Sequence, residues 1–212
     1  EISDSGLPTD KVYYFKAVAT YDDIQIESPV IFTTLAKCYV LRVLSPMGST
    51  IDHETGTISE LRVASDVEKV TIDVEVSPKA TWDLYYTATS NITYANKELD
   101  LRAGQTKTAY IRAKAEDGTE KTYKISVYRQ TRSEKPSISA SLGTARITSA
   151  DNKNIIYTID GTEPSESNGI RYSGPFEVSV GMVIKAIAKQ DGMDEYSDVE
   201  TFEMKESIVT IS

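Results

Sequence analysis

The chain has 212 residues, of which 40% are hydrophobic and 26% charged, and its formal net charge is −9. This balance excludes a disordered chain, and the excess of acidic side chains disfavours binding to nucleic acid. A single cysteine, Cys38, and a single histidine, His53, exclude an intrachain disulfide and a structural zinc site. No stretch reaches 18 uninterrupted apolar residues, so we expect no membrane insertion within this segment, and residues 1–4 lack the features of a signal peptide.

The first predicted elements are strands at residues 11–20 and 24–34, which alternate in character. The spacing from Leu7 to Tyr13, with an alternating run after it, resembles the tyrosine corner and penultimate strand of a fibronectin type III domain. Such a domain needs about 100 residues. Residues 1–35 are therefore expected to be the C-terminal part of a truncated module of this kind.

Strand signals are dense in the next part of the chain. Val70, Ile72, Val74 and Val76 alternate with polar residues, which predicts a strand with one face in the core and the other in water. Further alternating runs, separated by turn residues, fit a sandwich of about seven strands. These runs lie at residues 39–44, 57–63, 81–87, 98–101, 108–115 and 121–128.

The end of this region carries a more specific pattern. A turn from Leu99 to Gly104 precedes a strand, an Asp117-Gly118 hairpin and a last strand that ends in Arg129. The pattern resembles the bacterial cadherin-like β-sandwich domain, which implies one such domain over residues 37–130. The acidic inter-domain motifs of true cadherins are absent from the sequence, so the resemblance does not imply adhesion through calcium.

The third region follows a polar segment, residues 130–136, which ends in proline and predicts an extended connection. An alternating run then leads into Asp160-Gly161, and a proline follows at position 164. This sequence pattern predicts a tight β-hairpin.

A family pattern extends across the same region. The run from Ile155 to Pro164, together with segments 172–176, 183–188 and 196–197, resembles the chitobiase/hexosaminidase C-terminal type module, an immunoglobulin-like sandwich. That resemblance covers residues 135–204, and residues 205–212 are expected to be a tail or linker. The predicted fold class is all-β, with tandem immunoglobulin-like β-sandwiches in an elongated arrangement.

The residue types that catalysis needs are sparse. His53 is the only candidate base for an acyl-transfer triad, and it lies among turn residues with no Gly-x-Ser-x-Gly elbow to partner it. No spacing resembles an EF-hand loop, so calcium would require separate loops to converge. The oxygen ligands for such a site are Asp22, Asp23, Asp52, Asp151, Asn152 and Asp160, although a turn explains Asp160 on its own. We expect no enzyme, no cofactor and no metal.

Aromatic residues gather between positions 82 and 94. If residues 81–87 are extended, Trp82 and Tyr86 share the core side of the strand while Tyr85 faces out. Exposed aromatic rings can stack on sugars, so Tyr85 and Tyr94 are the candidate glycan-stacking residues.

Together the resemblances imply a non-catalytic spacer and interaction region of a large secreted or cell-surface bacterial protein. Its expected partners are other domains of the same polypeptide. The alternative is a carbohydrate- or cell-wall-binding accessory region of a carbohydrate-active enzyme, and a third hypothesis is adhesion to a host protein through an open sheet edge.

Overall fold

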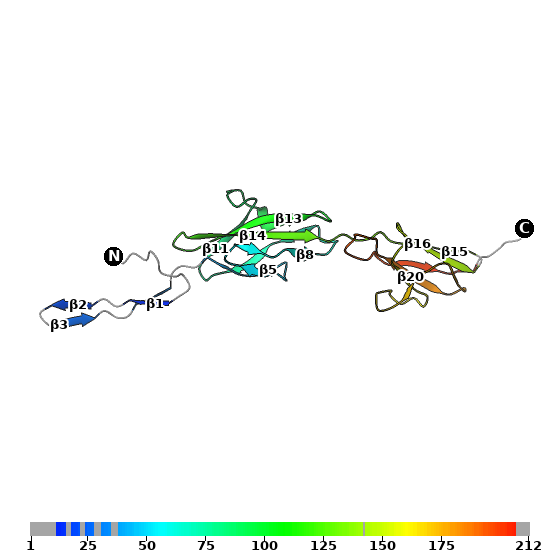
Figure 1. Cartoon of the computed structure of the whole chain (residues 1–212), viewed down its shortest axis with the longest axis horizontal. Coiled ribbons are helices and arrows are strands. Elements are labelled where there is room, and N and C mark those ends of the chain that lie inside the picture. The colour runs from blue at the N-terminus through cyan, green and yellow to red at the C-terminus, as the bar shows by residue number, and fades with distance from the viewer. Residues whose placement is uncertain are drawn as a thin grey trace, which may run out of the picture. The chain divides into compact units, whose positions relative to one another are not determined.

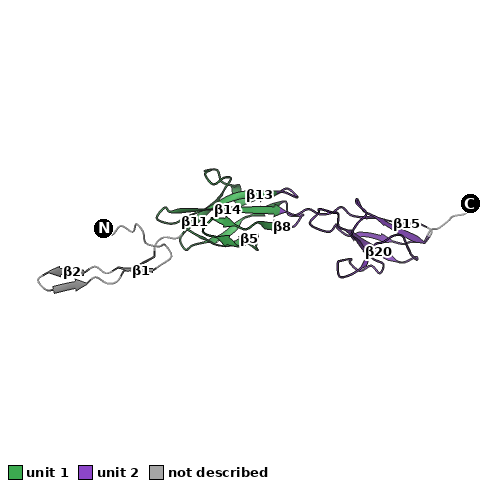
Figure 2. Ribbon diagram, viewed as in Figure 1, with its two compact units in different colours: residues 1–62, 69–101, 106–128 green, residues 63–68, 102–105, 129–212 purple. Residues whose placement is uncertain are grey.

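The computed structural model describes residues 38–141 and 143–206, together with the backbone of four short strands between residues 12 and 34. Its regular structure is β-strand apart from one 3₁₀ turn in the described residues, η1 (Ala95–Lys97), which confirms the predicted all-β fold class. No helix among these residues is long and apolar enough to cross a membrane. The chain divides into two compact units (Figure 2): one comprises residues 1–62, 69–101 and 106–128, and the other residues 63–68, 102–105 and 129–212.

The N-terminal strands pair as the arms of a hairpin. β1 (Val12–Phe15) pairs antiparallel with β4 (Ile31–Thr34), and β2 (Val18–Tyr21) pairs antiparallel with β3 (Ile24–Glu27). Leu7, Asp22 and Asp23 lie outside the described residues, so the tyrosine corner stays a prediction.

The rest of the first unit is built on one large sheet and two ribbons. The sheet has the order β11-β13-β14-β7-β6, with β8 also paired to β14, and the ribbons pair β10 with β5 and β12 with β9. Their bounds are β5 (Val40–Ser45), β6 (Ile51–Asp52), β7 (Thr57–Ile58), β8 (Leu61–Val63), β9 (Lys69–Thr71), β10 (Asp73–Val76), β11 (Thr81–Tyr85), β12 (Glu98–Asp100), β13 (Thr106–Lys114) and β14 (Glu120–Arg129).

The long hairpin of β13 and β14 forms the centre of this sheet (Figure 1), as the Asp-Gly signal predicts. The backbone N–H of Thr119 donates to the Asp117 carboxylate at 2.8 Å, and Gly118 adopts φ +88°. Alternate residues of both strands are buried, and among them Tyr123 has no exposed surface. The sheet therefore gives one face to the core of the first unit.

The predicted alternation at residues 70–76 is confirmed for three of its four apolar residues. Val70, Ile72 and Val74 are buried, while Val76 is half-buried. The run is split into two strands, because β9 pairs with β12 whereas β10 pairs with β5. Between them the N–H of Ile72 donates to the Lys97 carbonyl at 2.9 Å. One sequence run thus serves two sheet pairings.

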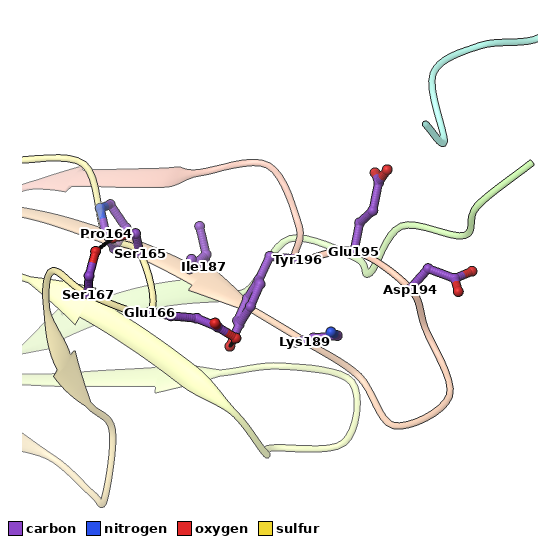
Figure 3. A pocket seen from close by; sticks show the side chains of 9 residues that line it. All are labelled: Pro164, Ser165, Glu166, Ser167, Ile187, Lys189, Asp194, Glu195 and Tyr196. Carbon is purple, nitrogen blue, oxygen red and sulfur yellow. Dashed lines mark hydrogen bonds between the residues drawn. The ribbon is translucent and has the colours of Figure 1, made fainter. Parts of the chain in front are cut away.

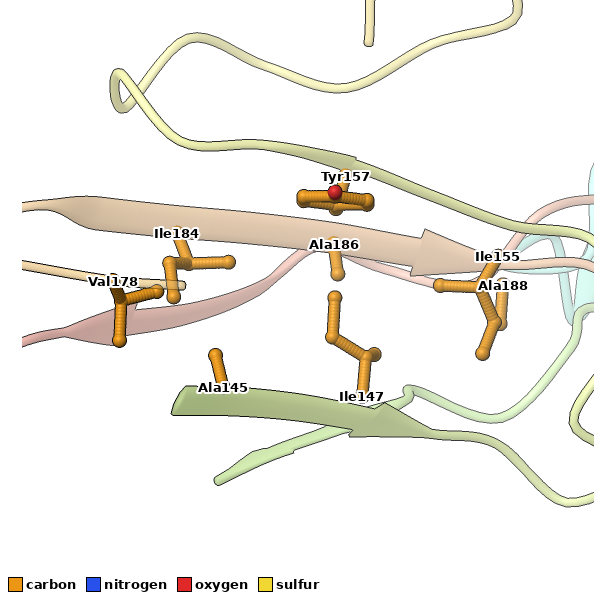
Figure 4. Close-up of a cluster of buried hydrophobic side chains, with 8 residues drawn as sticks. All are labelled: Ala145, Ile147, Ile155, Tyr157, Val178, Ile184, Ala186 and Ala188. Atoms are coloured by element: carbon orange, nitrogen blue, oxygen red, sulfur yellow. The ribbon is translucent and has the colours of Figure 1, made fainter. Parts of the chain in front are cut away.

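The second unit is a sandwich of two sheets. Its strands are β15 (Ser137–Ser141), β16 (Thr144–Thr148), β17 (Ile155–Thr158), β18 (Ile170–Arg171), β19 (Phe176–Glu177), β20 (Val183–Ala188) and β21 (Glu200–Glu203). One sheet has the order β15-β16-β19 and the other β18-β17-β20-β21. Ala145 and Ile147 of β16 face Ile184 and Ala186 of β20 across the core (Figure 4). This interior is closed within the unit.

The tight hairpin predicted at Asp160-Gly161 is wrong. The strand that pairs with β17 after this turn is β18, and residues 159–169 intervene between them. Asp160 instead bridges to Val183 of β20, and its carboxylate accepts bonds from Thr162. Pro164, which has no N–H for a strand ladder, lies within this intervening segment and is buried.

Candidate functional site

The loop of residues 159–169 covers an outer face of the second unit. All four residues of β17 are buried, including Ile156 and Thr158, which alternate with the core-facing Ile155 and Tyr157. Ile187 of β20 is buried as well. This sheet is therefore buried on both faces near the loop, and the loop forms one wall of a groove.

The groove has a volume of about 670 Å³. One wall is the turn at Pro164–Ser167, the floor includes Ile187, and the other wall holds Lys189 and Tyr196 from the chain after β20 (Figure 3). Its size is within the range of small-molecule sites.

Hydrogen bonds hold the turn wall in place. The N–H of Ser165 donates to the Asn168 carbonyl at 2.7 Å, and the N–H of Asn168 donates to the Ser165 hydroxyl at 3.1 Å. The Asn168 side-chain amide also donates to the Glu163 carbonyl at 2.8 Å. The position of Glu166, at the tip of this turn, is thereby set by its neighbours.

The opposite wall is anchored to the end of β20. The N–H of Ser197 donates to the Ala188 carbonyl at 2.9 Å, and the N–H of Ala188 donates to the Ser197 hydroxyl at 3.0 Å. Ser197 is buried, so the preceding Tyr196 is held beside the strand. This anchoring fixes where the tyrosine ring can lie.

Tyr196 connects the two walls. Its hydroxyl donates to the Glu166 carboxylate at 3.1 Å, and the Lys189 ammonium lies 5.5 Å from the centroid of its ring. Burial and the bond to Glu166 raise the pKa of Tyr196, so the phenol keeps its proton at neutral pH. The result is a half-buried aromatic ring with an acceptor and a cationic donor beside it.

The two other acids of the groove serve its structure. The Asp194 carboxylate accepts bonds from the N–H and hydroxyl of Thr131 at 2.9 and 2.8 Å. The Glu195 carboxylate accepts a bond from Arg132 at 3.1 Å. Both carboxylates point away from the ring of Tyr196 (Figure 3). Glu166 is consequently the carboxylate directed at the tyrosine ring.

The aromatic residues that the sequence singled out lie in the first unit. Tyr94 is 8% exposed and stacks on Tyr86, with ring centroids 3.9 Å apart, whereas Tyr86 is 47% exposed. Tyr85 is half-buried, and the Arg112 guanidinium lies 4.2 Å from its ring centroid. Glycan stacking by Tyr85 and Tyr94 stays a prediction.

The structure contradicts the expected position of Tyr86 and confirms that of Trp82. The expectation that Tyr86 faces the core is wrong, because β11 ends at Tyr85 and the strand alternation ends with it. Trp82 packs against the buried cluster of Cys38, Ala113 and Ala115, as predicted for a core residue.

His53 lies exposed in the turn between β6 and β7. Its Nδ1 is 2.9 Å from the hydroxyl of the buried Tyr123, and its ring packs edge-on against Tyr39 with centroids 5.4 Å apart. Burial raises the pKa of Tyr123 to about 12. The histidine thus satisfies the hydroxyl of a core tyrosine.

The acids considered for calcium are used as turn residues. Asp52, Asp151 and Asp160 each accept a backbone N–H from two residues further along the chain, at 2.8, 3.1 and 3.0 Å. The pKa of each carboxyl is lowered, at Asp52 chiefly by the Thr55 side chain, at Asp151 chiefly by the Asp191 N–H, and at Asp160 chiefly by the Thr162 hydroxyl, with the turn N–H bonds adding to each. Across residues 38–141 and 143–206, no group of three or more His, Cys, Asp or Glu side chains is placed to hold a metal ion.

Sequence reasoning missed the groove. Glu166 precedes Lys189 and Tyr196 by more than 20 residues and meets them only because the loop turns back over the sheet. The signal that could have found it is the polar turn Ser165–Asn168 directly after a proline, which indicates a compact loop instead of a hairpin.

Two family models match the chain. Residues 39–130 match the family described as cadherin-like beta sandwich domain, which confirms that resemblance. Residues 145–204 match the family described as Fn3 associated, within the region predicted to be an immunoglobulin-like sandwich. The predicted domain boundaries themselves stay predictions. No curated protein matches the sequence.

Solved structures show low overall similarity. The fibronectin(III)-like modules of Clostridium thermocellum CbhA share 16% identity, with 80% of this chain and 98% of that chain covered at a TM-score of 0.38. Immunoglobulin domains 1–4 of Sidekick-1 share 12% identity, with 90% and 56% covered at a TM-score of 0.31. At these scores the structures carry no argument about activity or ligands.

Proposed function

We propose that this chain is a non-catalytic structural and interaction region of a large secreted or cell-surface bacterial protein, where it extends and presents other domains. The observation that carries the proposal is that each unit has a buried interior of its own, centred on β13 and β14 in the first and on β16, β17 and β20 in the second. Cadherin-like and fibronectin-associated β-sandwiches are typical of extracellular proteins and typically non-catalytic.

A spacer requires an extended particle. A compact globule of this length has a radius of gyration of roughly 17 Å, because the radius scales with chain length. Small-angle X-ray scattering of the chain in solution is expected to give a clearly larger value. A radius near that of the compact globule would contradict the spacer function.

Carbohydrate or cell-wall binding is the second candidate function. The exposed ring of Tyr86, supported from behind by the stacked ring of Tyr94, favours it because a backed aromatic face is a surface on which a sugar ring can stack. We also propose from the sequence pattern that residues 135–204 are of the chitobiase/hexosaminidase C-terminal type, which would favour the same function; the family model that matches residues 145–204 is described as Fn3 associated. A host protein is the remaining candidate partner, and a pull-down with the immobilised chain tests it.

A further inference from the structure

The groove between the turn Pro164–Ser167 and Tyr196 has the features of a ligand site. Neither the spacer function nor sugar stacking on the Tyr86 and Tyr94 rings accounts for it. Tyr196 lies half-buried on its wall, and buried Ile187 contributes an apolar floor. A ligand site needs an apolar surface with a few directed polar groups, and here those groups are Glu166 and Lys189.

Charge selects the kind of ligand. The Glu166 carboxylate and the Lys189 ammonium flank the same ring, and no ion pair to another side chain is seen for either within the described part of the chain. An anionic ligand would be repelled by the Glu166 carboxylate, and a cationic ligand would be repelled by the Lys189 ammonium. A neutral ligand with hydroxyl groups avoids both, because hydroxyls donate to a carboxylate and accept from an ammonium.

We propose that this groove binds a neutral saccharide. The C–H face of one sugar ring packs on Tyr196, one hydroxyl donates to Glu166, and another accepts from Lys189. This inference deepens the second candidate function, carbohydrate binding, and is independent of the spacer function.

The test uses the whole chain and isothermal titration calorimetry. The probes are neutral tetrasaccharides (cellotetraose, xylotetraose, mannotetraose, tetra-N-acetylchitotetraose and galactotetraose), with tetragalacturonate as the anionic probe. We expect at least one neutral probe to bind, with weaker binding of tetragalacturonate. Tighter binding of tetragalacturonate, or no binding of any probe at millimolar concentration, would overturn the proposal.

Variants locate the site. Tyr196→Ala should weaken binding at least about tenfold, as truncation of a central aromatic contact commonly does. Tyr196→Phe keeps the ring and should stay within a few-fold of the native affinity, whereas Glu166→Gln should weaken binding several-fold. Glu166 is exposed, so this second variant folds even if Tyr196→Ala does not.

Val180→Ala is the matched control, because it removes an exposed side chain of the same unit that does not line the groove. Affinity unchanged by Val180→Ala and lost in Tyr196→Ala supports the groove. Tyr86→Ala tests the other candidate sugar surface, in the first unit. If Tyr86→Ala abolishes binding while the variants of Tyr196 and Glu166 bind normally, the groove proposal is wrong and carbohydrate binding survives at the other tyrosine. The two failures are therefore distinguishable.

Discussion

Gly169 stands where a side chain has no room. It adopts φ +133°, and a Cβ there would lie 2.7 Å from Ile156 Cγ2 and 3.0 Å from the Tyr157 carbonyl oxygen. Gly169→Ala is expected to lower the free energy of unfolding of the second unit by about 2–4 kcal/mol, through backbone strain and steric overlap. Urea denaturation measures the change.

Gly192 provides the control for this substitution. It also has a positive φ, +84°, but a Cβ there would have no neighbour within 4 Å. Gly192→Ala should therefore show only the backbone strain, about 1–2 kcal/mol. If both variants lose the same unfolding free energy, the close packing of Gly169 on β17 does not contribute to the cost of Gly169→Ala.

Asp160 gives the second unit a pH dependence. Bonds from the Thr162 hydroxyl and N–H lower the pKa of its carboxyl. A carboxyl with a lowered pKa in the folded state contributes stability above its unfolded pKa, and that contribution is lost as the pH falls through the folded value. Asp160→Ala should lower the melting temperature at pH 7, with a difference from the native chain that shrinks below about pH 3.

Asp160→Asn is the companion variant. Its amide oxygen can accept the same bonds from Thr162 without titrating, so its melting temperature at pH 7 should lie closer to that of the native chain. A native-to-alanine difference that persists unchanged at pH 2 would show that the carboxylate charge has no role.

At the scale of elements, β20 is central to the second unit. It lies between β17 and β21, and its Ile184 has no exposed surface. Ile184→Ala is expected to cost about 2–5 kcal/mol of unfolding free energy, because it leaves a cavity between the sheets. Val180→Ala, in a residue that is 57% exposed, should cost less than about 0.5 kcal/mol in the same assay.

The strands could largely be predicted, since alternation reports directly which face is buried. Val70, Ile72 and Val74 show this. The partner change at Ile72 could not be predicted, because the alternation of side chains is the same whichever strand is the neighbour. The Asp160-Gly161 turn failed for a related reason: an Asp-Gly pair fixes a local bend, and the chain beyond it decides whether the next strand returns.

At the scale of the whole molecule, two closed cores predict two separable unfolding events. Calorimetry is expected to show that Leu84→Ala, a fully buried residue of the first unit, lowers one transition temperature, and that Ile184→Ala lowers the other. Both variants moving the same single transition by similar amounts would show that the units unfold as one.

The candidate site depended on long-range placement and was less predictable than the fold. The sequence correctly indicated that His53 lies in a turn, but its bond to Tyr123 requires the hairpin of β6 and β7 to lie beside β14. Tyr196 and Glu166 likewise meet only through the loop over β17. The local sequence cannot specify such pairs, because the sequence around an acidic residue does not depend on which distant residue it contacts in the fold.

Cys38 gives the molecule a built-in chemical reporter. It is the sole cysteine of the chain, it is 6% exposed, and burial raises the pKa of its thiol, so both access and ionisation are suppressed in the native state. A disulfide reagent should react with it only when the edge that holds Trp82 opens. The labelling rate, measured against temperature or pulling force, would then report the rate at which the first unit opens locally, without the need to introduce a cysteine by mutation.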